Sequence, residues 1–133
     1  MTASTVVQML IRLCGVVLII LGALFWTGNA LTLIPVHMLV GLLLVLLLWT
    51  QAALAWRAGV GPGLVALAAV WGLVVPALGV TQTSLLPGDF HWLIQVLHLL
   101  VGIVALALGE SLAVRIKRRG VAGSTAEARA AMA

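Results

Sequence analysis

The chain is short of charge and of cysteine. Charged residues make up 8% of its 133 residues, and there is a single cysteine, Cys14. A lone cysteine excludes an intrachain disulfide. So little charge excludes an ordinary soluble domain, in which about a quarter of the residues are charged.

What the chain has in excess is apolar sequence. Hydrophobic residues make up 64% of it, and the mean hydropathy is +1.29. Runs near or above the roughly 20 apolar residues that span a bilayer occur four times, at about residues 6–27, 33–56, 63–83 and 90–114. Short connections between them predict one domain over residues 1–114, an all-α, up-down integral membrane four-helix bundle. Residues 115–133 are basic, then rich in Ala and Gly, and we expect them to form a disordered cytoplasmic tail.

Lys and Arg lie on one side of this predicted bundle. Arg12 is in the first span, Arg57 follows the second, and five more follow the fourth. The positive-inside rule then predicts a multi-pass protein of the bacterial inner (cytoplasmic) membrane with both termini in the cytoplasm. Because the basic tail has no interleaved aromatic residues, it indicates topology and anionic lipid rather than nucleic acid.

Two of the spans carry a histidine inside otherwise apolar sequence. His37 and His98 are each followed four residues later by glycine, at Gly41 and Gly102. An unpaired imidazole in hydrocarbon costs free energy, so an intramembrane histidine is a candidate functional residue. His37 precedes Arg57 by 20 residues, about 30 Å of helix. His98 precedes the basic residues after the fourth span by nearly as much, so both are expected at one depth in the outer leaflet.

The spans before the two histidine spans are also alike. Gly15 and Gly22 lie seven residues apart in the first span, as do Gly72 and Gly79 in the third, and a leucine precedes the second glycine of each pair. We interpret this as two tandem helical-hairpin repeats, related by a pseudo-two-fold axis along the membrane normal. In an up-down bundle the histidine spans then lie on one diagonal and the glycine spans on the other.

One ligand shared by His37 and His98 explains their matched depth. Zinc and copper sites normally need three or four protein ligands, and neither Asp89 nor Glu110 is expected near this level. Two imidazoles fit the axial positions of a porphyrin iron, to which the macrocycle supplies the other four ligands. Glycines on all four spans would leave room for the ring: Gly15, Gly22, Gly41, Gly72, Gly79 and Gly102. His91 lies two turns outside His98 on the same face.

In its architecture the chain resembles the four-helix membrane b-type cytochromes, namely the cytochrome b561 class and the core bundle of cytochrome b. The resemblance covers about residues 9–114 and consists of histidines on helices two and four and glycines on helices one and three. It implies haem b and electron transfer. Those families typically stack two haems. The level of a second histidine pair holds Gln51 and Leu112 here, so we expect one haem per chain.

The predicted haem site has no Lys or Arg at its level to pair with the haem propionates. Other groups near the outer surface would take this role, together with backbone N–H groups: Trp26, Asn29, His91 and Trp92.

We therefore expect one bis-histidine haem near the outer leaflet and electron exchange with quinol or a periplasmic partner. The chain would be a quinol-linked oxidoreductase or an electron carrier. One alternative is a non-enzymatic accessory or assembly subunit of a membrane complex, whose histidines only form hydrogen bonds. Another is a haem-free quinone-binding protein, in which His37 or His98 binds a quinone carbonyl. The expected partners are the lipid bilayer, a quinone, a redox protein or a second copy of the chain, and no nucleic acid.

Overall fold

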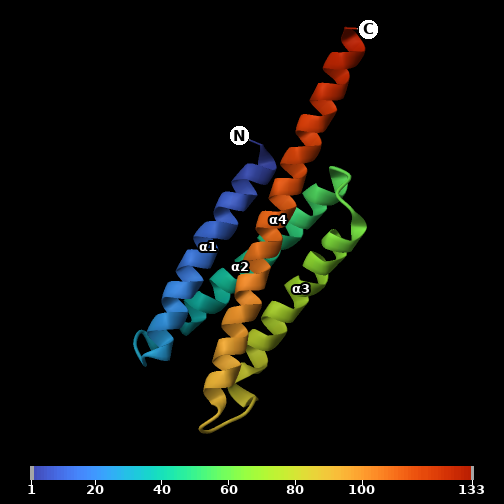
Figure 1. Cartoon of the computed structure of the whole chain (residues 1–133). Coiled ribbons are helices and arrows are strands. Elements are labelled where there is room, and N and C mark those ends of the chain that lie inside the picture. Colours follow the sequence, from blue (N-terminus) through green and yellow to red (C-terminus); the bar gives the residue numbers. More distant parts are fainter. Residues whose placement is uncertain (1, 133) are drawn as a thin grey trace.

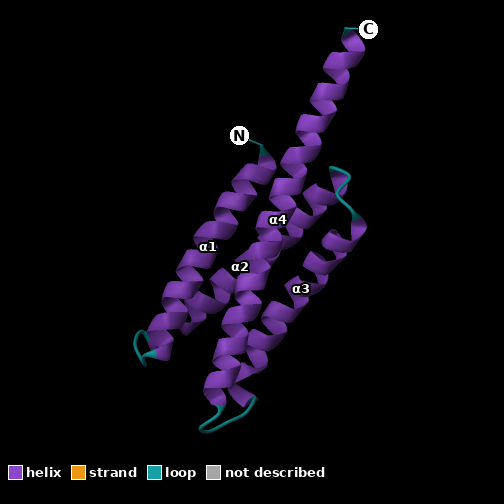
Figure 2. Cartoon of the chain, viewed as in Figure 1, coloured by secondary structure: helices purple, strands orange, loops and turns teal. Residues whose placement is uncertain are grey.

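The computed structural model describes residues 2–132, so Met1 and Ala133, the ends of the predicted domain and tail, lie outside the described residues. Four long helices run alternately up and down, and both chain ends lie at the same end of the bundle (Figure 1). They are α1 (Ala3–Trp26), α2 (Ile34–Arg57), α3 (Pro62–Thr81) and α4 (His91–Ala131), with the short 3₁₀ helices η1 (Leu31–Leu33) and η2 (Gln82–Ser84). Short loops join them, and the described residues contain no strand (Figure 2). The predicted all-α fold of four long helices is confirmed.

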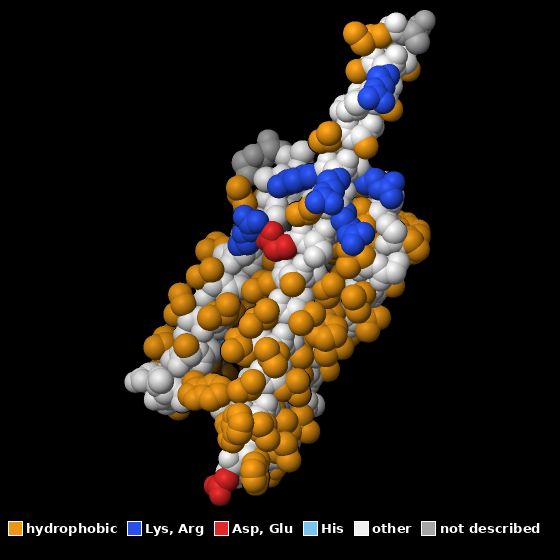
Figure 3. All heavy atoms as spheres, in the orientation of Figure 1, with side chains coloured by type: hydrophobic (Ala, Val, Ile, Leu, Met, Phe, Trp, Pro, Cys, Tyr) orange, Lys and Arg blue, Asp and Glu red, His pale blue; other side chains and the backbone are white. Residues whose placement is uncertain are grey.

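All four helices are long and apolar enough to cross a membrane. Large apolar side chains are exposed along every one of them. Figure 3 shows apolar side chains covering the visible face of the bundle, with Lys and Arg gathered toward the end that carries the termini. Soluble monomers rarely expose apolar patches of more than a few hundred Å². These features indicate a multi-pass membrane protein.

Glycines in the left-handed conformation end α1 and α2. Gly59 has φ +73° and follows α2. The next residue, Val60, donates its N–H back to the carbonyl of Ala55 at 3.0 Å, which is the backbone pattern of a Schellman motif. Gly28, with φ +75°, ends α1 in the same way. The two turns therefore follow from local sequence.

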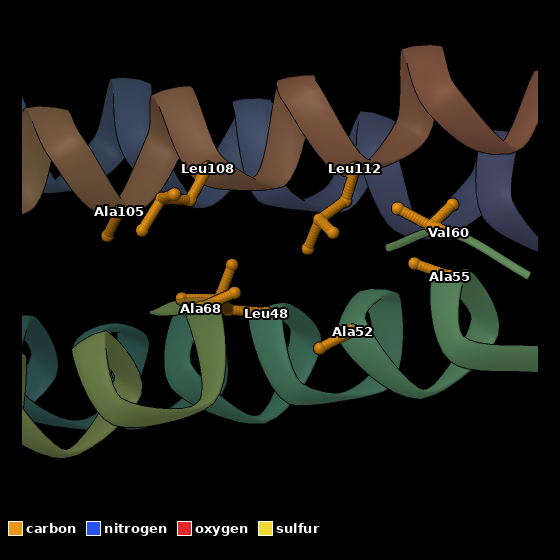
Figure 4. Close-up of a cluster of buried hydrophobic side chains, with 8 residues drawn as sticks. All are labelled: Leu48, Ala52, Ala55, Val60, Ala68, Ala105, Leu108 and Leu112. Atoms are coloured by element: carbon orange, nitrogen blue, oxygen red, sulfur yellow. The ribbon is translucent and has the colours of Figure 1, made fainter. Parts of the chain in front are cut away.

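The arrangement of the helices is a rhombus with one short diagonal. α2 and α4 contact each other and both remaining helices, whereas α1 and α3 make no contact with each other within residues 2–132. The core of this short diagonal lies in the half of the bundle nearer the termini and includes Leu48, Ala52, Ala105, Leu108 and Leu112. In Figure 4 the α4 residues Leu108 and Leu112 point across toward the α2 residues Leu48, Ala52 and Ala55. The predicted placement of the two histidine spans on one diagonal agrees with this arrangement.

Two tryptophans link neighbouring helices through the backbone. Nε1 of Trp49 on α2 donates to the carbonyl of Ala69 on α3 at 3.0 Å. Nε1 of Trp71 on α3 donates to the carbonyl of Val101 on α4 at 2.9 Å. Each indole N–H thereby gains an acceptor inside an apolar bundle, where an unpaired donor is costly.

Two of the glycines that were predicted to adjoin a cofactor, Gly15 and Gly72, face packed side chains instead. A Cβ added at Gly15 would come within 2.7 Å of the Leu106 methyl groups, and one added at Gly72 would overlap the Trp49 indole. Side chains of neighbouring helices therefore fill the space beside both, which is the usual role of small residues in membrane helices.

The tail also differs from prediction. α4 continues without a break through the basic residues to Ala131, although residues 121–132 are all exposed. Extending an existing helix requires no new nucleus, and alanine has the highest helix propensity. The extension is rich in it: Ala122, Ala126, Ala128, Ala130 and Ala131. The expected disorder neglected both effects.

A glycine that faces a packed side chain and a glycine with open space beside it should respond differently to substitution by alanine. Gly72→Ala should lower the free energy of unfolding by about 1–3 kcal/mol, because the added methyl overpacks against Trp49. Gly22→Ala should not destabilise the protein, since an added Cβ meets nothing within 4 Å there. Thermal unfolding in detergent, followed by circular dichroism, measures both against the wild type. Equal midpoints for the two variants would contradict the assigned packing role.

Candidate functional site

The structure brings His37 and His98 together. His37 lies in the first turn of α2 and His98 in the second turn of α4, at the end of the bundle away from the termini. Their ring centroids are 6.2 Å apart, and the ring planes are inclined by 44°. The sequence argument from depth therefore identified two residues that meet across the short diagonal.

Neither imidazole has a complete set of hydrogen bonds. The Nδ1 atoms of His37 and His98 are buried, and neither has a hydrogen-bond partner among residues 2–132. Leaving a buried polar atom unpaired costs about 1–3 kcal/mol. Because two such atoms lie on neighbouring rings in an apolar bundle, this pair is the candidate ligand-binding site of the chain.

All four helices contribute to the surroundings of this pair. The ring of Phe25 on α1 lies edge-on to His37, with centroids 5.4 Å apart and planes inclined by 61°. On α3, Gly79 faces the other imidazole, because a Cβ added there would lie 3.4 Å from Cε1 of His98. Phe25 therefore limits the orientation of one ring and the backbone of α3 limits the other.

Packing is loose around the histidines. Cβ atoms added at Gly22, Gly41 or Gly102 would meet no heavy atom within 4 Å. The larger cluster of buried apolar side chains lies nearer the termini, and the smaller one, around Ile11, Cys14 and Leu44, lies near the middle of the bundle. Gly22, Gly41 and Gly102 therefore have open space beside them, and Gly79 borders His98 directly. That these glycines adjoin a ligand stays a prediction.

The donor set fits a single iron held between two imidazoles. A metal–imidazole bond is about 2.0–2.1 Å long, and the nitrogen lies about 1 Å from the ring centre. One ion bonded to two imidazoles on opposite sides therefore separates the two ring centroids by about 6 Å. The 6.2 Å between the centroids found here is compatible with that separation. No group of three or more His, Cys, Asp or Glu side chains suited to a metal ion occurs in the described part of the chain. Two imidazoles suffice only where the remaining ligands come from a macrocycle, as in haem.

Two groups predicted to pair with haem propionates have local partners instead. Nδ1 of His91, the first residue of α4, lies 3.2 Å from the carbonyl oxygen of Leu85 in the α3–α4 loop. The side-chain amide of Asn29 donates to Thr27, to its backbone oxygen at 3.2 Å and to its hydroxyl at 2.9 Å. The His91 side chain therefore contacts the α3–α4 loop instead of pointing inward as expected. Trp26 and Trp92 are exposed near the same end.

A second polar group, which the sequence analysis did not identify as a cluster, lies at the opposite end. Glu110 on α4 accepts from Arg12 Nε at 2.6 Å and from Gln8 Nε2 at 2.7 Å, both on α1. Lys117 donates to Gln8 Oε1 at 3.1 Å. These contacts connect α1 to α4 just where the apolar part of the bundle ends, so Arg12 has a structural role beyond topology.

Gln51 extends this polar group to α2. Its side chain is fully buried, and Nε2 donates to Ser4 Oγ at 2.7 Å. The sequence did hold a signal for the cluster: Ser4, Gln8 and Arg12 are spaced by four residues, which places them on one face of a helix. Polar side chains on one face of an apolar helix predict a polar partner, and Gln51 and Glu110 provide it.

Comparison with known proteins gives no match to this chain. No family model matches it, and no curated protein or solved structure matches it. The resemblance to b-type cytochromes therefore stays a prediction from the sequence. Any functional proposal depends on the geometry of the histidine pair.

The polar cluster leads to a stability prediction. Glu110→Ala removes the acceptor of the buried Gln8 amide, and an unsatisfied buried amide costs about 1–3 kcal/mol. We expect a lower midpoint of thermal unfolding for this variant. Glu127→Ala is the matched control, because it removes the same group from the exposed extension of α4. A Glu110→Ala midpoint no lower than that of the control would show that the cluster does not stabilise the bundle.

Proposed function

We propose that this chain is a membrane b-type haem protein that holds one haem between His37 and His98 and transfers electrons. The observation that carries the proposal is the pair itself: two imidazoles on diagonal helices, 6.2 Å apart, with both Nδ1 atoms buried and unpaired within the described residues. The resemblance in helix order to the b-type cytochromes supports the same assignment.

In this proposal His37 and His98 would hold the haem iron, and the haem would supply one-electron redox chemistry. The protein's own part is to position the ligands. Phe25 and the backbone at Gly79 restrict the two rings, and the glycines with open space beside them leave room for the macrocycle. Because both axial positions would be occupied by protein, electron transfer is favoured over the binding of oxygen.

The distribution of charge supports an orientation for this site. Lys and Arg gather toward the end opposite the histidines (Figure 3), and basic residues favour the cytoplasmic side. We therefore assign the chain to a bacterial inner membrane with both termini in the cytoplasm. The histidine pair then lies in the outer leaflet, where its electron partner is quinol in the bilayer or a periplasmic protein.

The unpaired Nδ1 atoms also favour a second candidate, a quinone site without haem. A protonated Nδ1 of His37 or His98 could donate a hydrogen bond to a quinone carbonyl and thereby satisfy a buried group. The two candidates differ in colour, so one preparation distinguishes them.

The purified protein should be coloured. We expect a Soret band, with sharp α and β bands after reduction, since two imidazoles give six-coordinate, low-spin iron. Absorption spectra of protein from haem-replete cells, before and after addition of hemin, provide the measurement. A preparation that stays colourless in both cases would contradict the haem proposal, and quinone in its lipid extract would then favour the second candidate.

Histidine variants test which ligands hold the iron. His37→Ala and His98→Ala should each abolish stable haem binding or leave five-coordinate iron, because each removes one axial nitrogen. His91→Ala is the matched control and should keep the six-coordinate spectrum, since its ring contacts the Leu85 carbonyl. Loss of haem from His91→Ala together with retention in His98→Ala would show that the ligand pair is assigned wrongly.

A further inference from the structure

A groove of about 720 Å³ lies at the end of the bundle opposite the histidines. One wall is the turn between α2 and α3, at Val60 and Gly61, and the other is the face of α4 from Glu110 to Ala122. It lies where the apolar part of α4 gives way to its basic extension. The proposed haem site does not involve it.

Three arginines on α4 line this groove. Arg115, Arg118 and Arg119 are spaced three and four residues apart, which places them on one helical face. All three are exposed. The salt bridge and the hydrogen bonds found among residues 2–132 involve none of them, so their guanidinium groups are available to an anion.

The one carboxylate in the groove does not neutralise these arginines. Glu110 lines it too, but its oxygens accept from Arg12 at 2.6 and 2.7 Å and from Gln8 at 2.7 Å. The Glu110 charge is therefore already matched by Arg12 on the other side of α4. The groove keeps an excess of positive charge.

The opposite wall contributes a weaker positive potential. α3 begins at Pro62 with Gly61 as its N-cap, and no side chain caps it. The N-terminus of a helix carries partial positive charge, and Gly61 lines the groove. The charge on both walls therefore favours an anion.

We propose that this groove binds the headgroup of an anionic phospholipid from the leaflet on the side of the termini. Guanidinium groups match the geometry of phosphate oxygens, and basic pockets of this kind between membrane helices bind anionic headgroups. The lining also includes the exposed side chain of Val114, next to helix faces that expose apolar side chains. A lipid would use this apolar lining as well as the arginines, whereas a free phosphate ion would use the arginines alone.

The test compares two double variants of equal charge in the purified, full-length protein. Arg118→Ala/Arg119→Ala removes two charges from the groove, and Arg57→Ala/Arg129→Ala removes two from outside its lining. Binding of phosphatidylglycerol, with phosphatidylcholine as the neutral comparison, is measured by native mass spectrometry in detergent. We expect the groove variant to weaken phosphatidylglycerol binding by about tenfold or more, with little effect from the control variant.

Four results would overturn the proposal. Equal weakening by both double variants would show diffuse attraction to surface charge. Equal binding of phosphatidylcholine, or no weakening in the groove variant, would show that the arginines do not recognise the headgroup. Full displacement of the lipid by inorganic phosphate would show a small-anion site instead. Circular dichroism checks that the variants fold, and Arg118→Lys/Arg119→Lys should recover part of the affinity because it keeps the charge.

Discussion

The close approach of α2 and α4 is the constraint on which the remaining architecture depends. Small residues on these helices, Ala52 and Ala105 among them, let leucines such as Leu108 fill the space between the backbones. This contact makes α2–α4 the short diagonal, and α1 and α3 are consequently kept apart. Lateral separation of α1 and α3 is what a wide, planar ligand between the two histidine helices would require.

Polar contacts stabilise the same half of the bundle in a different way. Within a bilayer the hydrophobic effect does not drive helices together, so packing and interhelical hydrogen bonds carry the association. In this half Glu110 connects α4 to α1, and the indole of Trp49 connects α2 to α3. The indole of Trp71 connects α3 to α4 nearer the middle of the bundle, at Val101. One half is therefore fixed by both packing and hydrogen bonds. The half with His37 and His98 has fewer constraints and more open space around its glycines.

The sequence allowed the four helices and the meeting of the two histidines to be predicted, because helical rise converts residue number directly into depth. It did not reveal which glycines serve packing. Gly15 and Gly22 look alike in the sequence, and only the positions of Leu106 and Trp49 show that Gly15 and Gly72 are enclosed. The helical tail was missed because extending α4 into an alanine-rich segment requires no new helix nucleus. The tandem repeat remains an interpretation of the sequence.

The two histidines make no evident contribution to the stability of this fold. A leucine at either position would remove a buried, unpaired Nδ1 and the contact between the two imidazole rings. At position 37 it would also remove the aromatic contact with Phe25. The larger core cluster lies nearer the termini. Local choices that oppose stability without compensation from the fold are expected at functional sites. Of the three buried side-chain atoms without a hydrogen-bond partner within residues 2–132, two therefore lie at one place and on diagonal helices, where one shared ligand would satisfy both.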